Sequence, residues 1–152
     1  MNPSSEELPL EVDVRAVRIV REISGVSFQL ANPHDRKLEA YATENRTVIS
    51  RTILKSLLDR EADFLLLDCR EPVEHGMVNI EAATLIPMGQ LPERVTELEE
   101  HRERHIVVHC HHGGRSLQVT QWLRQQGFPK TQNMSGGIDV WAIEIDRSLP
   151  RY

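Results

Sequence analysis

Short apolar segments alternate with amphipathic segments along most of the chain after residue 46. The runs FLLLD (64–68) and HIVVHC (105–110) have the length and composition of strands that are buried on both faces. TVIS (47–50) and ATLIP (83–87) predict two more strands. The polar segment TQNMSGG (131–137) predicts a weak strand at the edge of a sheet, followed by a glycine turn.

Segments with helical spacing of apolar residues lie between these strands. After Ser50, a residue type that caps helices, apolar side chains in 51–61 recur at positions that share one helical face. A strong helical pattern in 116–127 ends at Gly127. Further helices are predicted within 71–76, 88–101 and 138–145. Strands and helices that alternate with short connections predict an α/β fold, in which a parallel sheet of about five strands has helices on both faces.

Residues 1–46 do not follow this alternation. LEVDVRAV (10–17) and VSFQLA (26–31) are strand-like, and residues 32–46 are polar and rich in turn formers, which predicts a loop or linker. Residues 12–35 also resemble 48–71 weakly, as a decayed repeat of one βαβ unit would. We therefore predict a strand-bearing N-terminal extension (1–46) packed on an α/β domain (47–152).

Composition and charge narrow the class of protein. The chain has 152 residues, of which 39% are hydrophobic and 27% are charged, and its formal net charge is −5. This profile predicts a globular protein and does not favour a nucleic-acid partner. The start of the chain is polar and acidic, and the longest apolar runs are too short to span a bilayer. With only two cysteines, Cys69 and Cys110, the expectation is a cytoplasmic protein with reduced thiols and no membrane partner.

Candidate chemistry gathers after the strand that ends at residue 110. Ligands of parallel α/β sheets bind outside the carboxyl ends of the strands, and Cys110 lies at such an end, just before a strong helix. The adjacent glycines in HHGGR (111–115) allow a tight turn whose N–H groups point inward, and the helix adds the positive end of its dipole. A thiolate is stabilised in such surroundings and is the reactive form of cysteine. The fork of Arg115 suits an oxyanion.

Two other interpretations of the same segment are open at this point. Cys110 could be a buried structural thiol at a strand end. The histidines at 109, 111 and 112 could join it in a zinc site, but adjacent residues at a strand end point in different directions, and no second ligand pair with suitable spacing follows. We predict no metal site, expect His109 to pack in or beside the sheet, and expect His101 and His105 to lie in a solvated helix end.

Three segments in order resemble the rhodanese family of sulfurtransferases: DCREPVEH (68–75), the loop Cys110-His111-His112-Gly113-Gly114-Arg115, and NMSGGIDVW (133–141). The resemblance covers about residues 47–152. Phosphatases and arsenate reductases of this fold have a Cys-x5-Arg loop, whereas this chain has Cys-x4-Arg. The shorter loop suits a cysteine persulfide better than a tetrahedral phosphate.

The resemblance implies a double displacement in which a Cys110 persulfide carries sulfur from a donor such as thiosulfate to cyanide, a cellular thiol or a protein acceptor. It implies a catalytic Cys110, structural roles for Asp68 and Arg70, and no cofactor. The residues expected to bind the donor are His111, His112, Gly113, Gly114, Arg115 and Ser116. A sulfur-relay module for a protein partner, and a phosphatase or arsenate reductase, stay as alternatives. Cys69 could resolve a persulfide on Cys110, although a small buried packing residue is the preferred interpretation.

Overall fold

The structure is a computed structural model that describes residues 17–22, 25–30 and 46–152. The chain divides into two compact units, residues 1–37 and residues 38–152. The second unit contains the α/β fold and every candidate site residue.

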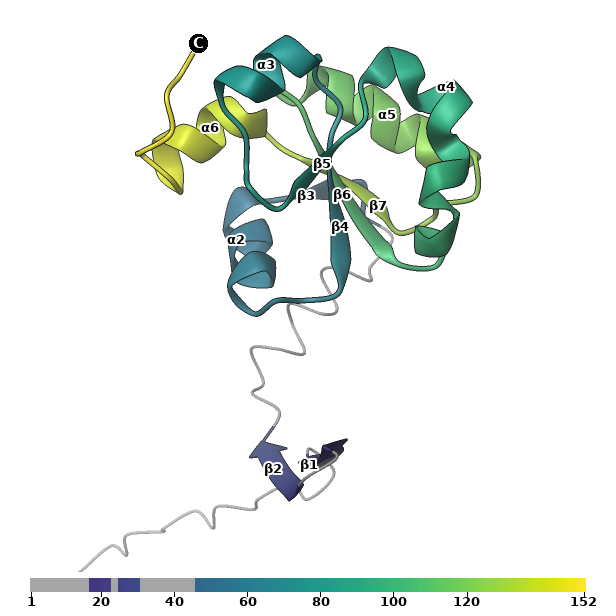
Figure 1. The fold of residues 1–152 in the computed structure, drawn as a ribbon, viewed down its shortest axis with the longest axis vertical. Coiled ribbons are helices and arrows are strands. Elements are labelled where there is room, and N and C mark those ends of the chain that lie inside the picture. The colour runs from purple at the N-terminus through teal and green to yellow at the C-terminus, as the bar shows by residue number, and fades with distance from the viewer. Residues whose placement is uncertain (1–16, 23–24, 31–45) are drawn as a thin grey trace, which may run out of the picture. The chain divides into compact units, whose positions relative to one another are not determined.

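A five-stranded parallel sheet forms the centre of the second unit (Figure 1). Its strands are β3 (Val48–Ile49), β4 (Phe64–Asp68), β5 (Ala83–Leu85), β6 (His105–His109) and β7 (Thr131–Met134). They lie in the order β3-β7-β6-β4-β5, and all neighbours are parallel. This confirms the predicted fold class. The two apolar runs of the sequence, β4 and β6, are neighbours in the middle of the sheet, as expected for strands covered on both faces.

The prediction that β7 is an edge strand was wrong. β7 pairs with β3 on one side and with β6 on the other, and all four of its residues are buried. Two of its three polar side chains are accommodated by hydrogen bonds inside the protein. Gln132 Oε1 lies 2.8 Å from Nε2 of His105, and Thr131 Oγ1 donates to the carbonyl of Phe128 over 2.9 Å. The same contact corrects the expectation for His105, which is buried at the start of β6 instead of lying in a solvated helix end.

Helices connect the strands, with bounds close to those predicted. They are α2 (Arg51–Asp59), α3 (Pro72–Met77), α4 (Leu91–Arg94), α5 (Gly114–Gln125) and α6 (Gly137–Glu144). Ser50 caps α2, since its Oγ accepts from the N–H of Ile53. The single helix predicted over 88–101 is instead three short segments: the 3₁₀ turns η2 (Met88–Gln90) and η3 (Val95–His101) flank α4. No helix in the described part of the chain is long and apolar enough to cross a membrane.

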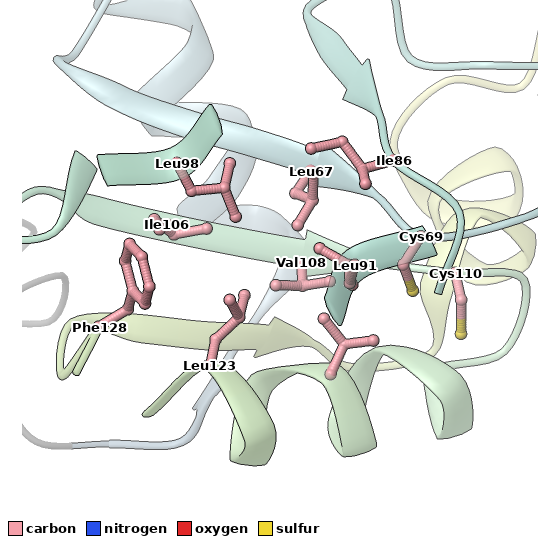
Figure 2. Packing of buried hydrophobic residues seen from close by; sticks show 11 residues of the cluster. Leu67, Cys69, Ile86, Leu91, Leu98, Ile106, Val108, Cys110, Leu123 and Phe128 are labelled. Carbon is pink, nitrogen blue, oxygen red and sulfur yellow. The ribbon is translucent and has the colours of Figure 1, made fainter. Parts of the chain in front are cut away.

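Two hydrophobic clusters cover the two faces of the sheet. Alternate residues of the central strands supply them, so Leu67 and Val108 enter one cluster while Leu66 and Val107 enter the other. The first cluster also takes apolar side chains from α4, η3 and α5, and the second takes them from α2 and α6. Figure 2 shows the first cluster, which ends at Cys69 and Cys110. The site therefore begins where the core stops.

The first unit contains an antiparallel pair of strands, β1 (Val17–Glu22) and β2 (Gly25–Leu30). β2 overlaps the strand predicted at 26–31, whereas the strand predicted at 10–17 lies outside the described residues except for Val17. The weak repeat would require a helix where β1 lies, so the structure contradicts it. The linker predicted over 32–46 falls outside the described residues, apart from position 46.

Shortening Leu67 tests the core. Leu67 is fully buried in β4, so we expect Leu67→Ala to lower the free energy of unfolding by about 2–5 kcal/mol through lost burial and the cavity left behind. Val73 on α3 is 69% exposed, and Val73→Ala should change it by no more than about 0.5 kcal/mol. Urea unfolding of both variants measures the difference. Equal losses would contradict this description of the core.

Candidate active site

Cys110 follows the last residue of β6, and the cysteine loop (residues 110–115) leads directly into α5. The loop turns at Gly113, whose φ of 100° lies in the left-handed region that glycine adopts without strain. α5 begins at Gly114, slightly before the predicted start. Its N-terminus is therefore directed at the end of β6. This is the carboxyl edge of the sheet, where the sequence placed the site.

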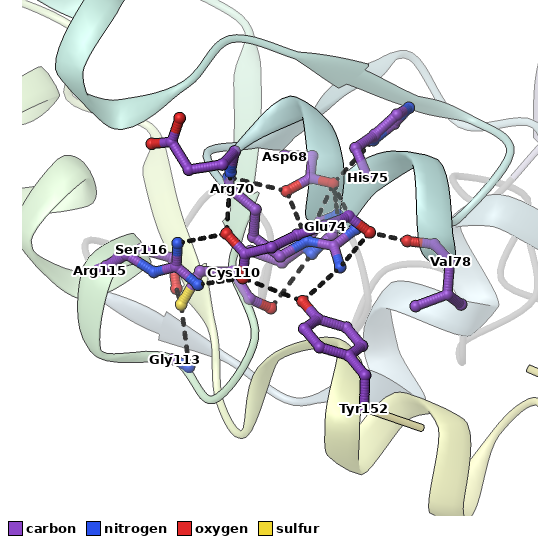
Figure 3. A network of polar contacts seen from close by, with 12 residues as sticks. Asp68, Arg70, Glu74, His75, Val78, Cys110, Gly113, Arg115, Ser116 and Tyr152 are labelled. Atoms are coloured by element: carbon purple, nitrogen blue, oxygen red, sulfur yellow. Dashed lines mark hydrogen bonds and ion pairs between the residues drawn. The ribbon is translucent and has the colours of Figure 1, made fainter. Parts of the chain in front are cut away.

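The Cys110 sulfur lies among hydrogen-bond donors. The N–H of Gly113 donates to Cys110 Sγ over 3.1 Å, and the hydroxyl of Ser116 donates over 3.3 Å (Figure 3). A hydrogen bond from the Cys69 thiol lowers the pKa of Cys110 most. Burial opposes it, and the Ser116 side chain and the N–H groups of Ser116 and Gly113 add to it, so that the pKa falls to about 4. Cys110 is thus a thiolate at neutral pH, although its residue is only 1% exposed.

The first residues of α6 hold the cysteine loop from the side opposite α5. The N–H of Ile138 donates to the carbonyl of Cys110 over 2.9 Å, and that of Asp139 donates to the carbonyl of His111 over 3.1 Å. Gly137 makes this approach possible, because a Cβ there would lie 2.2 Å from the carbonyl oxygen of His111. Since C=O and N–H point in opposite directions in a trans peptide, the two peptides direct their N–H groups away from α6.

A chain of polar contacts covers the loop. Arg115 forms a two-bond ion pair with Glu74 of α3, with Nη1–Oε2 and Nη2–Oε1 distances of 2.7 and 2.6 Å. The Tyr152 hydroxyl donates to Glu74 Oε1 over 3.0 Å and accepts from Nη1 of Arg70 over 2.8 Å (Figure 3). The bond from Arg115 lowers the pKa of Glu74 most, burial opposes it, and the value falls to about 2. The guanidinium expected to hold an oxyanion is therefore neutralised by a carboxylate in this structure.

Next to these contacts, Asp68 and Arg70 form a buried ion pair. Both side chains are 0% exposed, and Arg70 Nη2 lies 2.6 Å from Asp68 Oδ2. Arg70 also donates to the carbonyl of Val78 over 2.8 Å, and His75 Nδ1 lies 2.9 Å from Asp68 Oδ2. Burial alone would raise the pKa of Asp68, but the bonds from Arg70 and His75 bring it down to about 2. The pair ties the end of β4 to α3.

The histidines around Cys110 do not converge on one point. His109 is fully buried on the sheet with its Nε2 3.9 Å from Asp68 Oδ2, as expected for a residue packed in the sheet. The ring of His111 stacks between those of His112 and Tyr152, with centroid distances of 3.8 and 4.1 Å. In the described part of the chain, no three His, Cys, Asp or Glu side chains are grouped as a metal site requires.

The sequence located most of this site but missed some of its parts. Gly113 and Ser116, expected to bind the donor, contact the Cys110 sulfur itself, and Gly114 is exposed at the start of α5. Glu74 was missed, although the sequence has a pattern of a capped helix start: Glu71, then proline at position 72, then Glu74 three residues after Glu71. Nothing in the local sequence marks Tyr152, whose hydrogen-bond partners lie 78 and 82 positions away along the chain.

Comparison with known proteins agrees with this geometry. A family model described as the rhodanese-like domain matches residues 50–144, so the chain belongs to the rhodanese-like domain family. A sulfurtransferase from Allochromatium vinosum is 38% identical over 93 residues, which are 61% of this chain and 84% of that protein. A human single-domain sulfurtransferase structure superposes with a TM-score of 0.57 at 27% identity, covering 65% of this chain and 97% of that one.

Other relatives are much longer than the match. In an Arabidopsis thaliana chloroplast protein with rhodanese-like and PpiC domains, the 33% identical region covers 57% of this chain and only 30% of that protein. The relatives that are named sulfurtransferases support a sulfurtransferase class for this chain.

Removing the Asp68 charge tests the buried pair. Asp68→Asn leaves the Arg70 charge buried without its counter-ion, so we expect a loss of about 3–5 kcal/mol in the free energy of unfolding at neutral pH. The control is Glu144→Gln, which breaks an ion pair with Arg51 whose side chains are 27% and 45% exposed. It should cost no more than about 1 kcal/mol.

Asp68→Asn should also change how the free energy of unfolding depends on pH in acid. The pKa of Asp68 is about 2 in the folded chain and about 3.9 in an unfolded one, so its contribution is complete above pH 4 and is lost as the pH falls towards 2. Unfolding measured across this window should therefore be less pH-dependent in Asp68→Asn than in the parent protein. Parallel profiles would show that Asp68 is not held as an ion by Arg70.

Proposed function

We propose that this protein is a sulfurtransferase that carries sulfane sulfur as a persulfide on Cys110. The observation that carries the proposal is the environment of one sulfur atom: Cys110 Sγ accepts from Gly113 and Ser116 at the N-terminus of α5, and its pKa falls to about 4. A thiolate is the nucleophile that sulfur transfer requires. The sulfurtransferase relatives support the same class.

The reaction consists of two displacements at sulfur. The Cys110 thiolate attacks the outer sulfur of thiosulfate, the S–S bond of the donor breaks, and sulfite leaves with the bonding electrons. The product is a persulfide whose negative charge lies on the outer sulfur. Cyanide or a thiolate then attacks that outer sulfur, and the Cys110 thiolate leaves unchanged. The fixed N–H and O–H donors around the sulfur stabilise the anion at both ends of this cycle.

Donor binding is assigned to the rim of the cysteine loop. Nε2 of His111 is buried and has no hydrogen-bond partner among the described residues, so it is available to an oxygen of the donor. The more exposed His112 lies beside it, with its Nδ1 3.8 Å from Asp139 Oδ2. Arg115 is paired with Glu74 in this structure, and we assign it to the oxyanion end of the donor, which competes with Glu74 for the guanidinium. Because Cys110 is enclosed, the donor displaces rim side chains to reach the sulfur.

The first test replaces the nucleophile. Cys110→Ser keeps the size of the side chain but cannot form a persulfide, so thiosulfate:cyanide sulfurtransferase activity should fall to the uncatalysed rate. The parent protein should gain one sulfur atom in intact mass after thiosulfate treatment, and cyanide should remove it. If no sulfane donor adds sulfur to the protein, the proposal is rejected. Stable loading without turnover would favour a relay module, and hydrolysis of an aryl phosphate by Cys110 would favour a phosphatase.

The second test separates donor binding from packing at Arg115. Arg115→Gln removes the charge offered to the donor, and KM for thiosulfate should rise about 10- to 100-fold, the value of one charged hydrogen bond. Glu74→Gln breaks the same ion pair but leaves the guanidinium in place, so it serves as the matched control. Its KM should stay the same or fall. An equal rise of KM in both variants would show that Arg115 acts only through its contact with Glu74.

A further inference from the structure

A second cysteine lies beside the first at the carboxyl edge of the sheet. Asp68 of β4 is in register with His109 of β6, and the N–H of Cys69 donates to the carbonyl of His109 over 3.1 Å. Cys69 and Cys110 are therefore the next pair in the same register. Neither cysteine is in a disulfide, and both are buried.

The two side chains lie on the same face of the sheet. Successive residues of a strand point to opposite faces, so Leu67 and Cys69 share a face, as do Val108 and Cys110. All four belong to one hydrophobic cluster, and Figure 2 shows both sulfur atoms at its end. On the opposite face, the preceding pair of side chains, Asp68 and His109, approaches to 3.9 Å.

This placement has the dimensions of a disulfide. Neighbouring strands lie about 4.8 Å apart, and the Cα atoms of disulfide-bonded cysteines are about 4.4–6.8 Å apart. Cysteines in register on adjacent strands, with side chains on one face, can thus be joined with little movement of the backbone. Cys69 lies beside Cys110 at the end of one hydrophobic cluster, and its side chain is the group that lowers the pKa of Cys110 most.

We propose that Cys69 is a resolving cysteine that releases the carried sulfur as hydrosulfide when no acceptor takes it. The inference rests on the proposed persulfide at Cys110. The Cys69 sulfur attacks the inner sulfur of the persulfide, a Cys69–Cys110 disulfide forms, and the bond between the inner and outer sulfur breaks. The outer sulfur leaves with the bonding electrons and takes the Cys69 proton, so the product is HS⁻. The two cysteines are oxidised and the sulfane sulfur is reduced.

The disulfide stops sulfur transfer until it is reduced, because Cys110 is then no longer a thiolate. A dithiol reductant restores both thiols by exchange. In the reduced chain, the interaction with Cys110, burial and the neighbouring negative charge raise the pKa of Cys69, which keeps it a thiol. Because the thiolate is the nucleophile, the attack requires that the Cys69 proton passes to the outer sulfur of the persulfide as the new S–S bond forms.

The experiment follows one loading of the full chain with a stoichiometric amount of thiosulfate, without cyanide or added thiol. In the parent protein, the mass gain of one sulfur should decay to a species that lacks two hydrogen atoms relative to the reduced chain. One equivalent of hydrosulfide should appear with it. Peptide mass mapping should locate a bond between Cys69 and Cys110, and dithiothreitol should restore the reduced mass. Cys69→Ser replaces the thiol with a hydroxyl of similar size, so in this variant the persulfide should persist and release no hydrosulfide.

The outcomes separate this inference from the proposed function. If both proteins hold an equally stable persulfide, Cys69 does not resolve it and the inference fails while the proposed function stands. If neither protein loads, both fail. The oxidant diamide tests the geometry without a persulfide, and it should join Cys69 to Cys110 within one chain. If diamide instead gives no intramolecular bond in the folded parent protein, the two sulfurs cannot meet and the inference is overturned.

Discussion

The approach of α6 to the cysteine loop is the contact on which the site depends. Two N–H groups of α6 donate to the carbonyls of Cys110 and His111, and only a residue without a side chain at position 137 allows the backbones to come this close. Once these carbonyls are bonded to α6, the attached N–H groups are directed away from it. Gly113 then completes the turn and brings its own N–H to the sulfur. A loop built in this way requires no reorganisation when charge moves between the sulfur atoms, which is the property that preorganised donors contribute to catalysis.

A second group of contacts, centred on the ion pair of Asp68 and Arg70, stabilises the same edge of the sheet. The buried pair of Asp68 and Arg70 contributes little net stability as an isolated interaction, because the desolvation of two charges offsets their attraction. Its importance here is positional. Arg70 reaches both Val78 and Tyr152, and Tyr152 reaches Glu74, so one fixed charge at the end of β4 links α3 and the last residue of the sequence. Arg115 is paired with Glu74, so the cysteine loop is connected to this group of contacts as well.

The sequence was sufficient wherever the deciding interaction is local. The apolar runs of β4 and β6, the Ser50 cap and the glycines of the cysteine loop each indicate their own conformation, and the fold and Cys110 follow from them. Errors arose where distant segments decide. β7 looks like an edge strand because its side chains are polar, yet His105 and the carbonyl of Phe128 satisfy two of them inside the protein. Glu74 and Tyr152 become part of the site only after the chain brings α3 and residue 152 to the loop, and no local pattern encodes that meeting.

The two cysteines illustrate how one contact serves two chemical states. In the resting chain the low pKa of Cys110 favours the anion, and the neighbouring Cys69 side chain contributes most to that low pKa. In the proposed persulfide the charge lies one atom further out, so the inner sulfur no longer attracts the Cys69 proton and becomes an electrophile. The same short separation that favours the thiolate then favours formation of a disulfide. A chain with this arrangement transfers sulfur only if an acceptor reaches the outer sulfur before the neighbouring thiol reacts. The identity of residue 69 therefore sets the time for which the sulfur is carried, whereas the cysteine loop determines that it is carried at all.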